Sequence, residues 1–327
     1  DHKLKASMRQ LLLASMLAIA RSMATTAQPF VSAIESVAAP TAQTAKAWLQ
    51  ASPAGAYTTA RTHAGKVFEW SAHVQRTADS IGQMAPVGDA VDLVDPAKLR
   101  RRLDGAAGAV VDAYRATHGS EELKLTFLVS WDDAGAATVA AHASPLPPLP
   151  SKPVRVETRG APRANAAAKD SAWVSARAPL EKLQAAAHAP MNELLLSDEG
   201  KILEGSQTNF YAIVDGALVT AGEGILMGTV RRLALEVCER ESIPVVLEPP
   251  DLKDIERWEG CLISSTSRLL LPVDELYKPA EGAATTSADL VRAFDNAPGS
   301  LAERLRELVA AEVAAHSEAV GGGGGEL

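Results

Sequence analysis

Residues 192–221 read NELLLSDEGKILEGSQTNFYAIVDGALVTA, and this pattern of short apolar runs decides the class of fold. Two Asp/Gly turn signals, at 198–200 and 215–216, separate apolar runs of strand length. The loop EGILMG at 223–228 follows and leads into an expected helix at 229–241. The segment therefore predicts short strands joined by tight turns, followed by a helix.

Strands and helices continue to alternate on both sides of this segment. Toward the C-terminus we expect strands at 243–248 (IPVVLE) and 260–267 (GCLISSTS), a short helix at 251–258, and helices at 286–296 and 299–317. Toward the N-terminus we expect strands at 55–62 (GAYTTART), 123–132 and 137–143, and helices at 71–84 and 99–117. Both halves thus mix the two kinds of element.

A proline-rich stretch at 143–153, ASPLPPLPSKP, separates the halves. Proline disfavours both helix and central strand, so an extended linker is expected there. The predicted fold class is α/β (mixed α+β) in two domains. The expected divisions are a leader or unstructured segment at 1–33, a small N-terminal α/β domain at 34–144, a linker at 145–155, a C-terminal domain at 156–318 and a flexible Gly-rich tail at 319–327.

The N-terminal segment is basic and carries no acidic residue between Asp1 and Glu35. Its apolar run at 11–20 is about half the length needed to cross a bilayer. We therefore expect an organelle leader, directing the chain to a plastid or mitochondrion, with the cytoplasm as the next choice. A secretory signal and an ordinary helix are the other readings of this segment.

Composition excludes several classes of function. The chain has 327 residues and a net charge of −8, which argues against a nucleic-acid-binding surface. Its two cysteines offer no disulfide framework, and its seven scattered histidines offer no paired spacing for a metal. Neither a metal site nor a membrane association is expected, and small molecules are the expected ligands.

Two ionisable residues in the second half are candidates for chemistry. Lys169, in NAAAKDSAWV, is a potential amine nucleophile, because burial lowers the pKa of a lysine. Glu204 follows the expected strand at 201–203. Taken alone, each is more simply explained as an exposed surface charge.

Other residues are suited to binding an anion. Gly228, Thr229 and Val230 open an expected helix, where free backbone N–H groups and the helix dipole attract phosphate. The glycine spacing at 222–228 is one residue too long for a dinucleotide fingerprint. The hydroxyl cluster at 264–267 (SSTS) and Arg76, three residues after His73, can also contact phosphate.

Together these groups are the parts needed to hold pyridoxal 5'-phosphate. An amine forms a Schiff base with its aldehyde, and a carboxylate keeps its pyridine nitrogen protonated. A helix end, hydroxyls and an arginine neutralise its phosphate.

With these residues, the chain resembles the class IV (fold type IV) pyridoxal-phosphate-dependent aminotransferases. That family includes branched-chain and D-amino acid aminotransferases and aminodeoxychorismate lyase. The motifs that carry the resemblance occur in family order: GAYTTART, FEWSAHVQR, PRANAAAKDSAWVSAR, NELLLSDEGKILEGSQTNF, GILMGTVRR and ISSTSRLLLPV. They span about two-thirds of the chain, and their form is most similar to the plant and algal aminotransferase-like branch.

The resemblance implies a role for each candidate. Lys169 matches the Schiff-base lysine, and Glu204 the partner of the pyridine nitrogen. The residues that contact the phosphate in the family are matched by Arg76, Gly228, Thr229, Val230 and Thr266. Tyr57 matches a tyrosine on the substrate side of the site. The resemblance further implies a homodimer that transfers an amino group between an amino acid and a 2-oxo acid, with a barrel-like sheet in the larger, cofactor-binding domain.

Departures from the family pattern leave the substrate open. Val174 replaces the tyrosine that branched-chain enzymes carry five residues after the lysine. Trp131 and Asp132 stand where D-amino acid enzymes use arginine and histidine. Only candidates for binding the substrate carboxylate can be named: Arg61, Arg177 and Arg268. The donor and its L or D configuration are not fixed.

Two alternatives to aminotransfer are kept at this point. One is the lyase branch of the same fold, which releases 4-aminobenzoate and pyruvate. The other is a non-catalytic homologue that acts as an interaction protein. The joint presence of the lysine, glutamate, arginine and threonine argues against the second alternative.

Overall fold

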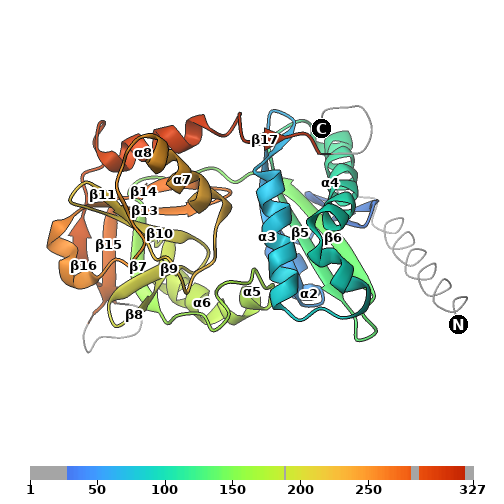
Figure 1. The fold of residues 1–327 in the computed structure, drawn as a ribbon, viewed down its shortest axis with the longest axis horizontal. Helices are drawn as coiled ribbons and strands as arrows, with labels where there is room; N and C mark the ends of the chain where they lie inside the picture. The colour runs from blue at the N-terminus through green and yellow to red at the C-terminus, as the bar shows by residue number, and fades with distance from the viewer. Residues whose placement is uncertain (1–27, 188, 281–286, 321–327) are drawn as a thin grey trace, which may run out of the picture.

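The computed structural model describes residues 28–187, 189–280 and 287–320 (Figure 1). Most of the expected leader and most of the expected glycine-rich tail lie outside the described residues. One boundary needs correction: strand β1 begins at Phe30, so residues 30–33 belong to a sheet and not to the leader.

A first sheet of seven strands is formed mainly by the N-terminal half. Its order is β17 (Ser317–Glu318), β4 (Lys66–Phe68), β3 (Gly55–His63), β5 (Leu123–Trp131), β6 (Ala137–Pro145), β1 (Phe30–Ile34) and β2 (Val37–Thr41). The helices of this half are α2 (Ala45–Ala51), α3 (Trp70–Gln83), the 3-10 helix η1 (Gly88–Val94) and α4 (Pro96–His118).

Helices α3 and α4 cover one face of the first sheet (Figure 1). The buried residues of α3 recur at helical spacing, from Trp70 through Val74 and Ala78 to Ile81, so one stripe of the helix packs on the strands. Strands β3 and β5 present alternate residues to this core, including Ala60, Leu125 and Phe127. The residues between them point to the opposite face, where the functional site lies.

A second sheet of ten strands is formed by the C-terminal half. Its main order is β12 (Val245–Val246), β11 (Ala217–Val219), β10 (Asn209–Val214), β9 (Lys201–Gly205), β8 (Glu193–Asp198), β7 (Arg155–Gly160), β15 (Glu275–Pro279) and β16 (Ala288–Ala293); β13 (Trp258–Ser265) pairs with β10 and with β14 (Leu269–Val273). The helices are α5 (Ala172–Ala176), α6 (Ala178–Ala186), α7 (Thr229–Arg240), the 3-10 helix η2 (Leu252–Arg257) and α8 (Leu301–Ala311).

The predicted helix at 286–296 is wrong. Residues 288–293 form strand β16, which pairs antiparallel with β15 at the edge of the second sheet. A helix of about three turns is marginal on its own, so a continuous ladder of sheet hydrogen bonds decides the conformation. The expected strand at 243–248 is likewise reduced to β12, two residues long.

The two sheets are connected by more than the chain between them. Strand β17, at the end of the expected C-terminal domain, pairs with β4 and so belongs to the first sheet. The backbone around Lys169 pairs with the start of β3: the Tyr57 N–H donates to the Lys169 carbonyl at 2.9 Å, and the Ser171 N–H donates to the Gly55 carbonyl at 2.9 Å. This link fixes Lys169 against the open face of the first sheet. Among the described residues, no helix is both long and apolar enough to cross a membrane.

Candidate active site

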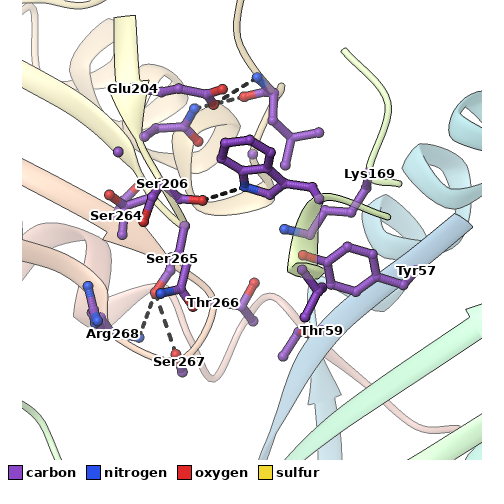
Figure 2. Close-up of a pocket in the computed structure, with 18 of the residues that line it drawn as sticks. Tyr57, Thr59, Lys169, Glu204, Ser206, Ser264, Ser265, Thr266, Ser267 and Arg268 are labelled. Carbon is purple, nitrogen blue, oxygen red and sulfur yellow. Dashed lines mark hydrogen bonds between the residues drawn. The ribbon is translucent and has the colours of Figure 1, made fainter. Parts of the chain in front are cut away.

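A cavity of about 240 Å³ lies between the two sheets (Figure 2). It brings together all of the site residues expected from the sequence: Tyr57, Arg76, Lys169, Glu204, Gly228, Thr229, Val230 and Thr266. Figure 2 shows Lys169 and Tyr57 side by side on one wall, with Glu204 and the 264–268 segment on the other. These eight expected residues, which are up to 209 positions apart in the chain (57 to 266), thus meet in one cavity.

Lys169 extends into this cavity from a segment held by backbone hydrogen bonds. Its N–H donates to Ser80 Oγ at 3.1 Å, and its Nζ lies 4.8 Å from the centre of the Tyr57 ring. Burial lowers the pKa of Lys169, and the charges of Arg76, Arg163 and Arg177 lower it further, while Tyr57 acts in the opposite direction. The protonated form is therefore less favoured than in water, as a nucleophile or base requires.

Tyr57 is the nearest aromatic neighbour of that amine. Burial raises the pKa of its hydroxyl, but the charges and hydrogen bonds of Lys169 and Arg177 outweigh burial and lower the pKa overall. A polar hydroxyl beside a buried amine can hold that amine in one orientation.

Glu204 is buried on the far wall and is bound on both carboxylate oxygens. Its Oε1 accepts from Arg163 Nε at 2.8 Å, and its Oε2 accepts from the Leu226 N–H at 3.0 Å. Burial raises the pKa of Glu204, whereas the Arg163 charge and the Leu226 hydrogen bond oppose that rise. Arg163 also lies 5.3 Å from the centre of the Trp173 ring.

The sequence analysis assigned no role to Arg163. It occurs in the quoted motif PRANAAAKDSAWVSAR, six residues before Lys169. Its closeness to the lysine in the sequence was the signal that could have identified it as a site residue. Its ion pair with a residue 41 positions away could not be read from that motif.

The start of α7 forms an anion-binding end of the cavity. Gly228 caps the helix without a side-chain hydrogen bond, which leaves the first N–H groups free of a side-chain acceptor. The hydroxyls of Thr229 and Thr266 approach to 3.5 Å there. A methyl group on Gly228 would come within 2.1 Å of Asn209 Oδ1, so the close approach requires glycine.

Arg76 reaches the same cavity from α3. Its Nη2 donates to Thr58 Oγ1 at 2.8 Å, and its buried Nε has no hydrogen-bond partner among the described residues. Burial lowers its pKa to about 10, and the nearby Tyr57 opposes that effect. A buried guanidinium with a free donor is suited to binding an anion.

The three candidates for the substrate carboxylate have different positions. Arg177 lines the cavity beside Tyr57. Arg268 also lines it but forms an ion pair with the buried carboxylate of Glu193, at 3.4 Å. Arg61 is not among the lining residues, and neither Trp131 nor Asp132 is, whereas Val174 is.

The cavity is strongly positive although the whole chain has a charge of −8. Seven cationic side chains line it and only two carboxylates do; beyond those already described they are Lys46, Lys124 and Glu181. The site therefore fits a ligand with several negative charges, such as a phosphate ester together with a carboxylate. No cluster of potential metal ligands occurs within the described part of the chain.

Comparison with known proteins agrees with this chemistry. The model of the class IV amino-transferase family matches residues 55–276, more than half of the chain. The chain belongs to this family. A protein of Methanocaldococcus jannaschii named as a putative branched-chain-amino-acid aminotransferase is 26% identical over 233 residues, which cover 68% of this chain and 78% of the relative.

Solved structures share the fold. A branched-chain aminotransferase of Thermoproteus uzoniensis with norvaline is 19% identical with a TM-score of 0.64, covering 88% of this chain and 95% of that one. A hypothetical aminotransferase of Mycobacterium tuberculosis in its PLP-bound form is 18% identical with a TM-score of 0.63, covering 88% and 99%.

Four expectations are thereby confirmed: fold type IV, membership of the class IV aminotransferases, a transferase activity on amino and keto acids, and pyridoxal phosphate as the cofactor. The lyase alternative and the non-catalytic alternative are not favoured by these relatives. The closer placement in a plant and algal branch stays a prediction.

Proposed function

We propose that Lys169 is the residue that links pyridoxal phosphate covalently and moves the proton during amino-group transfer. The observation that carries this proposal is the position of its Nζ, buried between the Tyr57 ring and a cavity whose far wall holds Glu204 and the start of α7. When bound, the cofactor supplies an aldehyde that condenses with amines and a ring that withdraws electrons from the amino acid.

The chain's own residues fit the parts of that cofactor. Arg76, the free N–H groups at Thr229 and Val230, and the Thr266 hydroxyl would hold its phosphate, with Gly228 allowing the close approach. Glu204, kept in place by Arg163, would hold a proton at the ring nitrogen. A carboxylate there keeps the ring cationic, which strengthens its electron withdrawal.

Lys169 would then take the proton from Cα of the amino acid and return it to the cofactor's C4′ carbon. Its lowered pKa supports this role, because a neutral amine is needed to accept the proton. Tyr57 would keep the amine pointed toward that proton. Release of the keto acid would consume one water molecule, and transfer of the amino group to a second keto acid would return it.

Two features outside the cavity belong to the same proposal. We propose a homodimer, as the family resemblance implies. From the acid-poor and basic N-terminal segment we also propose a plastid or mitochondrial location, with the cytoplasm as the alternative.

Absorbance spectra of the purified protein with added pyridoxal phosphate test the function. We expect a visible band from the protein-bound cofactor in the wild type and none in Lys169→Ala. Adding single L- or D-amino acids should bleach the band and release the matching keto acid. Release of pyruvate and 4-aminobenzoate from aminodeoxychorismate instead would favour the lyase, and absence of any band in the wild type would refute the proposal.

A further inference from the structure

Two polar side chains lie behind the cavity, in the otherwise apolar core of the first sheet. Thr58 of β3 and His73 of α3 are both completely buried, and neither lines the cavity. On β3, the residues two positions before and after Thr58 are Ala56 and Ala60, which belong to the apolar core. Polar groups in such a core cost free energy unless they are hydrogen-bonded, so the partners of this pair point to its role.

Both side chains contact the guanidinium of Arg76, and they contact the same nitrogen. Arg76 Nη2 donates to Thr58 Oγ1 at 2.8 Å and lies 3.3 Å from His73 Nδ1. An Nη2 group has two hydrogens, and two acceptors use both of them. The hydrogens of Nε and Nη1 are therefore left for a ligand, and Nε has no partner among the described residues.

The contacts of His73 decide which of its ring nitrogens carries the proton. A guanidinium only donates hydrogen bonds, so Nδ1 must accept and the proton of the neutral ring is on Nε2. Thr58 Oγ1 lies 2.7 Å from Nδ1, so this hydroxyl can accept from Arg76 and donate its own hydrogen to the ring. Burial lowers the pKa of His73 well below its usual range, and the charges of Arg76 and Lys169 act in the same direction. The neutral ring is therefore the favoured form.

Few other contacts fix the Arg76 side chain. Its backbone carbonyl accepts from Ser80 Oγ at 2.8 Å, and the same hydroxyl accepts from the Lys169 N–H at 3.1 Å, so the backbone is held at this point. No carboxylate among the described residues faces the guanidinium; the charge that opposes the fall of its pKa is that of Tyr57. An arginine side chain without a counter-ion has many rotamers, and ordering it when a ligand binds costs affinity.

We propose that His73 is a positioning residue for the cofactor's phosphate: with the Thr58 hydroxyl, its Nδ1 holds Arg76 Nη2 and so keeps the rest of the guanidinium directed at the phosphate. This role rests on the proposed function, which assigns the phosphate to Arg76 and the start of α7. A guanidinium that is already in place binds the anion without a further loss of side-chain freedom. Removing the Nδ1 contact should therefore weaken the binding of the phosphate and not that of the ring.

A comparison of pyridoxal phosphate with pyridoxal isolates the phosphate contact, because the two molecules share the ring and the aldehyde. Titration of the cofactor band gives the Kd of each, and the ratio of the two is the preference for phosphate. We expect His73→Leu to reduce this preference at least about tenfold, a typical loss for one hydrogen bond to a charged group. His73→Asn should keep it within about threefold, because its amide oxygen is as many bonds from the backbone as Nδ1 is.

Three further variants show whether the effect passes through Arg76. In an Arg76→Leu background, His73→Leu should change the preference by less than about twofold, because the group that it positions is gone. Val74, next to His73 on α3, is an apolar core residue, so Val74→Ala should lower the melting temperature and leave the preference unchanged. If His73→Leu does not fold, Thr58→Val removes the other acceptor of Nη2 with little change of shape and should reduce the preference in the same way.

Nitrogen NMR of the histidine side chains in the cofactor-free protein gives a readout that does not depend on the cofactor. The signals of His73 are those that disappear in His73→Asn. At neutral pH we expect the proton on Nε2 and none on Nδ1. A proton on Nδ1, or a doubly protonated ring, would overturn the acceptor role.

The binding outcomes separate this role from the proposed function. An unchanged preference in His73→Leu, equal weakening of pyridoxal and pyridoxal phosphate, or the same loss with and without the Arg76 side chain would overturn the positioning role. A wild type that binds pyridoxal phosphate no more tightly than pyridoxal would instead refute the phosphate site of the proposed function, and the role of His73 with it.

Discussion

Replacing Glu204 by glutamine separates the structural role of this carboxylate from its proposed chemical role. Glu204 and Arg163 form a buried ion pair, with side chains 4% and 9% exposed and Oε1 and Nε 2.8 Å apart. At an effective dielectric constant of about 20, charges about 4 Å apart attract each other by about 4 kcal/mol. Glu204→Gln leaves the guanidinium without a counter-charge, so the free energy of unfolding should fall by about 3–5 kcal/mol.

The effect on activity should be larger than stability alone explains. With a neutral amide in place of the carboxylate, the ring nitrogen loses the group proposed to keep it protonated. We expect kcat for the amino-group transfer to fall by roughly 100- to 1000-fold, the usual loss when one electrostatic contact to developing charge is removed. Stopped-flow absorbance of the half-reaction measures this rate at temperatures where the variant is folded.

A double variant makes the test decisive. Arg163→Met in the Glu204→Gln background removes the unpaired charge. Thermal and denaturant unfolding should then show that about half or more of the lost free energy of unfolding is regained. The rate should not return, because the carboxylate is still missing. If the double variant recovered both stability and rate, Glu204 would be only the partner of Arg163, and its proposed role at the ring nitrogen would be wrong.

Three other perturbations test separate parts of the account. Arg177→Met removes a positive charge that lowers the pKa of Lys169, so that pKa should rise. Reductive methylation of the amine in the cofactor-free protein, followed by mass spectrometry, should then need a higher pH, and an unchanged pH profile would contradict the coupling. Gly228→Ala places a methyl group 2.1 Å from Asn209 Oδ1. Equilibrium dialysis should therefore show that pyridoxal phosphate binds at least about tenfold more weakly than to the wild type. Unaltered affinity would show that the residues around Gly228 shift easily to make room for the methyl group. Glu69→Gln removes a buried carboxylate that pairs with the exposed Arg232 of α7 and contacts His316 of the C-terminal segment. Calorimetry should show about 2 kcal/mol less stability, with a matching loss of cofactor affinity. A loss of stability with full affinity would refute the link to the site.

The sequence predicted the parts of the site that depend on local signals. The turn and helix-start signals around 198–230 predicted a strand ending just before Glu204, and β9 in fact continues through Glu204 to Gly205. They also predicted the N–H groups at Thr229, and β5 and β6 follow from alternation and a short Asp/Gly turn. Spacing along the chain is enough here because each feature is fixed by its immediate neighbours.

Features that depend on distant contacts were missed. Lys46 and Glu181 both line the cavity and form an ion pair, but they are 135 positions apart, and nothing in either local sequence predicts this contact. Lys124 lies in an ordinary strand pattern, and only the register with β3 shows that it faces the cavity. The helix expected at 286–296 was wrong for the same reason, since its conformation is decided by pairing with β15.

The central claim is that the Lys169 amine carries the cofactor, and borohydride reduction tests it most directly. Reduction of the loaded wild type converts the link between amine and cofactor into a stable bond, which peptide mass mapping assigns to one residue. The account predicts pyridoxyl modification at Lys169, its absence in Lys169→Ala, and an unchanged result in Lys182→Met, in which the replaced lysine is exposed and does not line the cavity. Modification of another lysine in the wild type, or retained modification in Lys169→Ala at the same yield, would contradict it.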